Sequence, residues 1–101
     1  MKKKSKITNL EFALLNILNL IQNNNFNDKE VARIILKNKN KLLDISSVLY
    51  LRDPNNALDL NNLIDDAETK QSLDVLRVTD EIEKTITNLG LEFQRWEKLS
   101  V

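Results

Sequence analysis

Residues 75–96 read VLRVTDEIEKTITNLGLEFQRW, and this stretch decides the fold. Apolar side chains or threonine recur in it at alternating spacings of four and three residues, at Val75, Thr79, Ile82, Ile86, Leu89, Phe93 and Trp96. Such spacing places the side chains along one side of a helix, which we call the seam. A helix with this seam has to pack against other helices. Gly90 lies inside the pattern and either ends the helix early or admits a close neighbour.

The rest of the chain also favours helices. The 101 residues include one glycine and one proline, and 42% of them are apolar. Sandwiches and barrels need turn residues about every 8 to 12 positions, which argues strongly against a sheet protein. A chain of this length forms one domain that buries about two thirds of its unfolded surface. The sequence therefore predicts an all-α protein, an antiparallel bundle of four helices in a single domain over residues 1–101.

A capping box marks the start of the first predicted helix. In this motif, the side chains of Thr8 and Glu11 each bond a backbone amide of the first turn. The helix is expected to run to about Gln22. Because it is apolar around most of its circumference, it is either central in the bundle or partly exposed for a partner, and we favour the central position.

A second capping box, made by Asn27 and Glu30, begins a helix that is expected to continue to Leu49. Asn38 falls in the apolar line of this helix. An asparagine at such a position either fixes the register of the bundle or lies at its wet edge.

The third helix is expected to begin at Pro54 with Asp53 as its cap. Between residues 65 and 72 the apolar pattern slips, which indicates either a turn or a stutter in one long helix. We favour a turn with Thr69 as the cap of the last helix. One long helix over residues 54–97 would instead give a bundle of three helices.

Residues for catalysis or metal binding are scarce. The chain has no histidine and no cysteine, so the commonest general base, zinc ligand and nucleophiles are missing. Asp65 and Asp66 are adjacent and would project about 100° apart on a helix, which does not suit a shared catalytic site. We therefore expect no enzyme activity, no cofactor and no bound metal.

Basic residues recur every four positions at Lys29, Arg33, Lys37 and Lys41. We call these residues the basic stripe. The stripe is either a solvated face or a docking surface for an acidic partner. Nucleic acid is disfavoured as the partner, because the formal net charge is zero and the pI is about 6.3, whereas nucleic-acid-binding domains usually have a pI above about 9.

All charged residues between Arg52 and Lys70 are acidic, at positions 53, 59, 65, 66 and 68. These carboxylates either pair with the basic stripe inside the fold or face other partners. We favour pairing inside the fold.

Phe93 and Trp96 are the aromatic residues near the end of the chain. They either close the core or form an exposed recognition patch, since aromatic side chains dominate the energetics of many interfaces. Together with the basic stripe, Phe93 and Trp96 are the candidate partner-binding residues.

The first six residues, MKKKSK, are basic and are expected to be disordered. They resemble the opening of a signal peptide, but Glu11, Asn16 and Asn19 interrupt the apolar run that follows, and no small-residue cleavage site comes after it. The run is also much shorter than the roughly 18 residues of a membrane span. We therefore expect a cytoplasmic protein.

The second predicted helix resembles bacteriocin immunity proteins of the enterocin A type. The resemblance covers Asn27-Asp-Lys-Glu30, the stretch Ile34–Leu42, Ile45 and the segment Val48–Arg52. It implies an antiparallel four-helix bundle that protects a producer cell against its own bacteriocin by engaging the membrane receptor complex of the toxin. The long last helix of this chain differs from the family pattern.

A second resemblance involves the later helices. Asp53-Pro54, Ala57, Leu60-Asn61 and Leu63-Ile64, together with Ile82-Glu-Lys84, Ile86 and Leu89, are similar to small helical chaperones of type III secretion filament subunits. That resemblance implies a chaperone that holds an aggregation-prone partner through coiled-coil contacts. It would require Ile82, Ile86 and Leu89 to be partly exposed in the free protein.

Both resemblances imply stoichiometric binding of another protein without catalysis. Our leading hypothesis is an immunity or inhibitor protein that neutralises or sequesters a protein target through an exposed helix face. A homodimer is compatible with the sequence.

Overall fold

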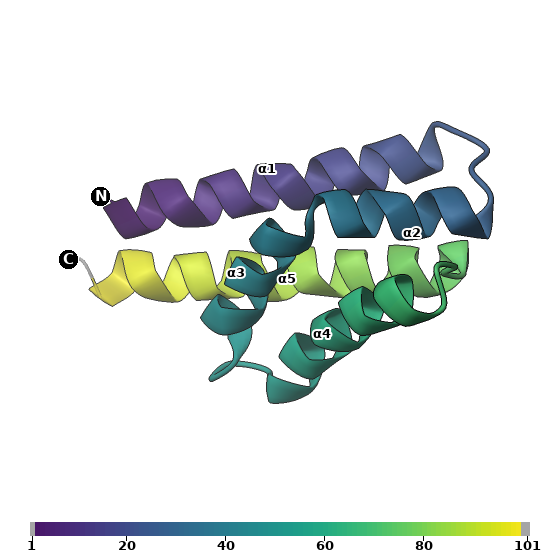
Figure 1. Cartoon of the computed structure of the whole chain (residues 1–101). Coiled ribbons are helices and arrows are strands. Elements are labelled where there is room, and N and C mark those ends of the chain that lie inside the picture. The colour runs from purple at the N-terminus through teal and green to yellow at the C-terminus, as the bar shows by residue number, and fades with distance from the viewer. Residues whose placement is uncertain (1, 100–101) are drawn as a thin grey trace.

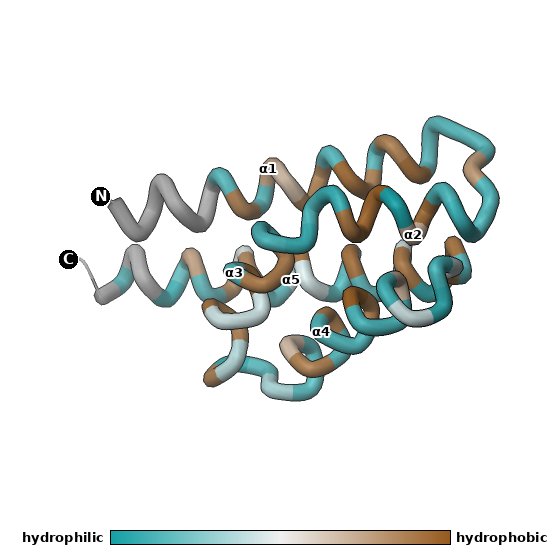
Figure 2. Tube along the Cα trace, viewed as in Figure 1, coloured by the Kyte–Doolittle hydropathy of each residue, from teal (hydrophilic) through white to brown (hydrophobic). Residues whose placement is uncertain are grey.

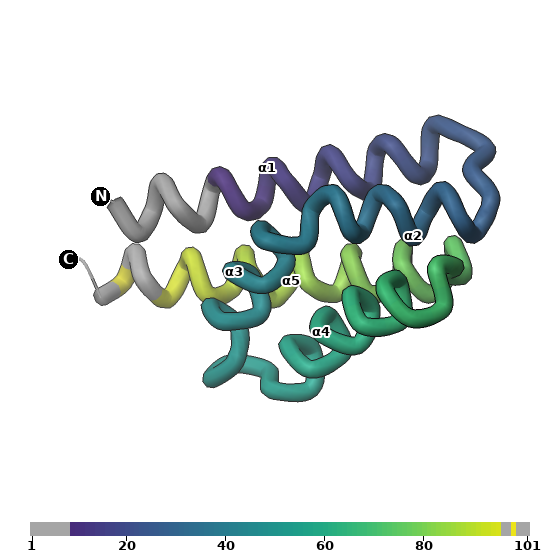
Figure 3. Tube along the Cα trace, in the orientation of Figure 1, coloured from purple at the N-terminus to yellow at the C-terminus, as the bar shows by residue number. Residues whose placement is uncertain are grey.

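The computed structural model describes the backbone of residues 2–99 and the side chains of residues 9–95 and 98 (Figure 3). All the secondary structure in this range is helical, which confirms the prediction of an all-α protein. The helices are α1 (Lys2–Gln22), α2 (Asp28–Lys37), α3 (Lys39–Leu49), α4 (Pro54–Thr69) and α5 (Val75–Leu99).

The two longest helices, α1 and α5, lie side by side and run in opposite directions (Figure 1). Helix α2 returns along α1, and α3 then turns away from it towards the far side of the bundle. Helix α4 packs against α2, α3 and α5. This arrangement leaves one long side of α1 uncovered.

The predicted second helix is two helices, α2 and α3, because the chain breaks at Asn38. This residue has φ −104° and ψ 14°, outside helical values. Its side-chain Nδ2 donates to the carbonyl oxygen of Ile34 at 2.8 Å, and its backbone N–H donates to Ile35 at 3.1 Å. A local side-chain bond of this kind competes with the helical ladder. Asn38 is therefore a helix terminator, and the expected four-helix count was wrong.

The start of α1 also differs from the sequence prediction. Helix α1 begins at Lys2, so Thr8 lies inside it and is not its cap. The prediction that residues 1–6 are disordered falls in part on Met1, which lies outside the described residues, while the backbone from Lys2 onwards belongs to α1.

Two other predicted caps are confirmed. In the second capping box, the backbone N–H of Glu30 donates to Asn27 Oδ1 at 2.9 Å, and the N–H of Asn27 donates to Glu30 Oε1 at 3.1 Å. Asp53 Oδ1 accepts from the N–H of Asn56 at 3.0 Å, and Pro54 is the first residue of α4.

The predicted turn between residues 65 and 72 is also confirmed, because α4 ends at Thr69 and α5 begins at Val75. Thr69 is not the cap of α5, since its hydroxyl donates to the carbonyl of Asp65 within α4. Asp74 takes that role, because its Oδ2 accepts from the N–H of Arg77 at 3.0 Å.

Neither role predicted for Gly90 is found. Helix α5 continues through this residue, and a Cβ atom built on it would have nothing within 4 Å. Gly90 therefore neither ends the helix nor admits a close neighbour.

The core contains apolar side chains from every helix, and Figure 2 shows how apolar segments alternate with polar ones along each of them. The large side chains with under 2% exposure are Leu14, Val31, Ile35, Leu42, Ile45, Leu49, Leu60, Leu63, Val78, Ile82 and Leu89. On α5 the fully buried line passes through Val78, Ile82, Thr85 and Leu89. The seam members Val75, Thr79, Ile86 and Phe93 are only half-buried beside it.

Helix α1 is peripheral, so the central position that we favoured for it was wrong. Its inner side is buried against the bundle, but Phe12, Leu15 and Leu20 are 58%, 38% and 44% exposed on its outer side. No helix in the described part of the chain combines the length and apolar character needed to cross a bilayer.

Candidate functional site

The basic stripe lies on the outside of the bundle. Lys29, Arg33 and Lys37 occupy the exposed side of α2, whose opposite side is buried at Val31, Ala32, Ile34 and Ile35. Lys41 is exposed near the start of α3. Because the chain changes direction at Asn38, the stripe consists of three cations on one helix and a fourth on the next.

No described residue forms an ion pair with a stripe side chain. Three of the four acidic residues of α4, which we expected to pair with the stripe, pair with other cations instead. Asp66 Oδ2 accepts from Arg77 at 2.7 Å, and Glu68 Oε2 accepts from Lys39 at 2.7 Å. The favoured pairing of the acidic run with the stripe was therefore wrong.

These pairings change the electrostatics of α4. The hydrogen bond from Arg77 lowers the pKa of Asp66, and the positive charge of Lys70 lowers it further. Asp59 lies 3.8 Å from Lys84 Nζ on α5. Asp59, Asp66 and Glu68 thus each have a cationic partner within the fold, whereas the exposed Asp65 and the basic stripe on α2 and α3 have no ion pair among the described residues.

Of the two residues of the predicted aromatic patch, only Phe93 has a described side chain. Phe93 is half-buried and packs against the core. The side chain of Trp96 lies outside the described residues. The open part of the predicted site is therefore the basic stripe.

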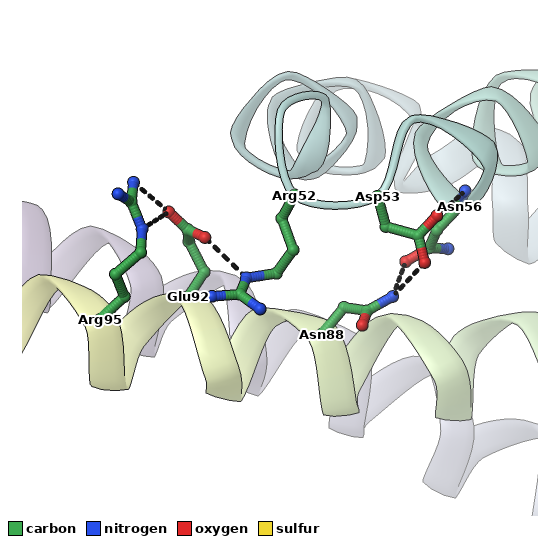
Figure 4. A network of polar contacts seen from close by, with 6 residues as sticks. All are labelled: Arg52, Asp53, Asn56, Asn88, Glu92 and Arg95. Carbon is green, nitrogen blue, oxygen red and sulfur yellow. Dashed lines mark hydrogen bonds and ion pairs between the residues drawn. The ribbon is translucent and has the colours of Figure 1, made fainter.

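A polar network that the sequence reasoning missed connects the turn after α3 with α5 (Figure 4). Glu92 is 4% exposed. Its Oε2 accepts from Arg52 Nε at 2.8 Å, while its Oε1 accepts from Arg95 Nη2 at 2.7 Å. Burial raises the pKa of Glu92, but the hydrogen bonds from Arg95 and Arg52 lower it by more, so it lies below its ordinary value.

The second half of the network surrounds Asn56, which is fully buried at the start of α4. Its Nδ2 donates to Glu81 Oε2 at 2.6 Å and to Thr85 Oγ1 at 3.0 Å. Its Oδ1 accepts from Asn88 Nδ2 at 2.9 Å, and that amide also donates to Asp53 Oδ2 at 3.1 Å. No buried side-chain polar atom among the described residues lacks a partner. The network fixes the N-terminus of α4 on α5.

Glu81 has an unusual environment at the edge of this network. Burial and the negative charge of Asp59 raise its pKa, and the hydrogen bond from Asn56 only partly offsets them. The described residues contain no cluster of three or more potential ligands that could hold a metal ion. A single perturbed carboxyl with its partners defines no reaction, and the contacts of this network are those of a structural clamp.

A sequence signal for the network existed. Thr85 and Glu92 are polar residues seven positions apart on the line of α5 that is otherwise apolar. The predicted seam passes through Ile86 and Phe93, one position after Thr85 and Glu92, so the sequence analysis did not predict the burial of these two polar residues.

Comparisons of the chain with protein-family models, curated proteins and solved structures gave no match.

Proposed function

We propose that the chain is a cytoplasmic, non-catalytic protein of the immunity or inhibitor type, which neutralises or sequesters an acidic protein target. The target would bind at the basic stripe on α2 and the start of α3. The supporting observation is that the stripe side chains are exposed without an ion pair among the described residues, whereas Asp59, Asp66 and Glu68 of α4 pair elsewhere in the fold.

The physical basis of the proposal is the difference between cations that form an ion pair within the fold and cations that do not. A cation that already pairs within the fold must lose that contact when it binds a partner. The stripe cations lose nothing of this kind, and their clustering attracts an acidic surface over about a Debye length. Lys39, Arg77 and Lys84 are each within 4 Å of a carboxylate and lack this advantage.

The secretion-chaperone alternative receives no support from the packing of α5. Its proposed coiled-coil surface contains Ile82, Ile86 and Leu89. Ile82 and Leu89 have 0% exposure, and Ile86 is half-buried. Binding through this surface would require α5 to separate from the bundle.

Site-specific photo-crosslinking tests the proposed docking surface. A photoreactive residue is placed at Arg33 or Lys37 and, as a control, at the exposed Lys70 after α4. Crosslinked proteins from the native host are then identified by mass spectrometry. The proposal predicts an acidic protein that crosslinks from the stripe and not from position 70. Equal crosslinking from all three positions, or none from the stripe, would count against it.

A further inference from the structure

The outer side of α1 carries apolar side chains that the bundle does not use. Phe12 and Leu15 are 58% and 38% exposed and lie three residues apart, so they are neighbours on the helix surface. Leu20 is 44% exposed five residues after Leu15. The inner residues Leu14 and Ile17 are at most 2% exposed, so the bundle already satisfies the opposite side of α1.

Charge along α1 is strongly uneven. Residues 9–22 contain a single charged residue, Glu11, whereas lysine occupies positions 2, 3, 4 and 6 just before them. These lysines belong to the first turns of α1. The antiparallel neighbour α5 adds the exposed Lys98 near its own end. A basic segment is therefore followed by an exposed side on which Phe12, Leu15 and Leu20 lie among the uncharged polar residues Asn9, Asn16 and Asn19.

We infer that the outer side of α1 is a binding surface for an anionic membrane. Lysines next to exposed apolar side chains attract the headgroups of anionic lipids, while the Phe and Leu side chains enter the boundary between headgroups and acyl chains. The bundle stays folded in the bound state, because Phe12, Leu15 and Leu20 lie outside its core. This surface differs from the basic stripe, which lacks aromatic side chains.

The alternative occupant of this surface is an acidic protein. The exposed apolar side chains favour a membrane over that alternative. Electrostatic attraction alone would use the lysines and leave Phe12 and Leu15 in water. A lipid surface uses both features of α1 at once. Its affinity depends on the apolar side chains as well as on salt.

Vesicle flotation with the full chain tests the inference. One vesicle preparation contains phosphatidylcholine alone, and the other contains equal parts of phosphatidylcholine and phosphatidylglycerol. The wild-type chain is expected to float with the anionic vesicles and not with the neutral ones, and bound protein should decrease as salt is raised. The double substitution Phe12→Ser and Leu15→Ser should weaken binding by roughly tenfold or more.

The matched control is Leu51→Ser with Leu58→Ser. These leucines are 90% and 56% exposed. Leu51 belongs to the turn between α3 and α4 and Leu58 to the second turn of α4, and this turn lies on the other side of the bundle from α1 (Figure 1). The control should bind like wild type. Circular dichroism checks that each variant is folded, and Leu20→Ser replaces the double variant if that one does not fold.

Several results would overturn the inference. One is the absence of wild-type binding to anionic vesicles. This includes the case in which the chain binds poly-L-glutamate, which represents an acidic protein, but does not bind lipid. Another is unchanged binding by the α1 variants. Equal losses in the α1 variant and the α3–α4 control would likewise overturn it, because the apolar contribution would then not belong to α1.

Discussion

Arg52 Nε donates a 2.8 Å hydrogen bond to Glu92 Oε2 and thereby ties the turn between α3 and α4 to α5. The two residues are 40 positions apart in the chain. Arg95 binds the other carboxylate oxygen of Glu92, so the buried charge is compensated from both sides. Removing the charge of Glu92 should cost more than breaking a surface ion pair, because a neutral buried side chain accepts weaker hydrogen bonds from the two partly exposed arginines.

Replacing Glu92 with Gln should lower the free energy of unfolding by about 1–3 kcal/mol. The amide keeps the shape of the side chain but removes the charge that the two arginines share. Urea unfolding measures the effect. Glu83→Gln is the control, since Glu83 is exposed on the same helix and should change stability by less than about 0.5 kcal/mol. Equal effects of the two substitutions would show that the clamp contributes nothing.

The pH dependence of stability should distinguish Glu92 from Glu81. The pKa of Glu92 is lowered in the folded state, so its contribution is present above the unfolded pKa and is lost as the pH falls through the folded pKa. The pKa of Glu81 is raised, so its contribution is present below the unfolded pKa and is lost as the pH rises through the folded pKa.

Urea unfolding between neutral pH and about pH 3 tests these signs. Compared with wild type, Glu92→Gln should lose less stability on acidification, and Glu81→Gln should lose more. Three parallel curves would mean that neither carboxyl changes its pKa on folding.

Asn56→Ala should destabilise the fold by roughly 2 kcal/mol or more, because it leaves several polar groups on α5 without a buried partner. Asn55→Ala is a close control, since the neighbouring side chain is exposed in the same turn of α4. Thermal melting of both variants measures the difference. A loss no larger than that of the control would show that water replaces the Asn56 amide without penalty.

Gly90→Ala should raise the free energy of unfolding by about 1 kcal/mol. Alanine favours the helix over glycine, and nothing lies within 4 Å of the added methyl group. Urea unfolding measures the gain. A destabilised variant would mean that α5 is not regular at this position.

Local signals in the sequence predicted local structure well. The Asn27–Glu30 capping box and the Asp53–Pro54 helix start depend on residues within one turn, and the structure contains both. The break at Asn38 was missed because the apolar line continues across it. The side-chain bond of Asn38 ends α2 locally, while the direction that α3 then takes depends on its packing against α4, a long-range contact that no short pattern encodes.

Long-range packing also explains the other failures. The peripheral position of α1 depends on which helices pack against it. Because α1 has apolar residues on both sides, its sequence pattern does not predict which side is buried. On α5, neighbours on more than one side bury Val78 and Thr85 together with the seam members Ile82 and Leu89, and leave the other described seam members half-buried. The basic stripe was predicted by sequence spacing, but its lack of ion pairs was visible only once the partners of the α4 acids were known.

The most direct test of the proposed function is the affinity of the crosslinked partner for a charge-reversed stripe. Arg33→Glu with Lys37→Glu should weaken binding by at least about tenfold while leaving the fold intact, since both side chains are exposed and unpaired among the described residues. The charge-matched control Lys70→Glu with Lys98→Glu should bind like wild type. Unchanged affinity of the stripe variant, measured by isothermal titration calorimetry, would contradict the proposal that the stripe is the docking surface.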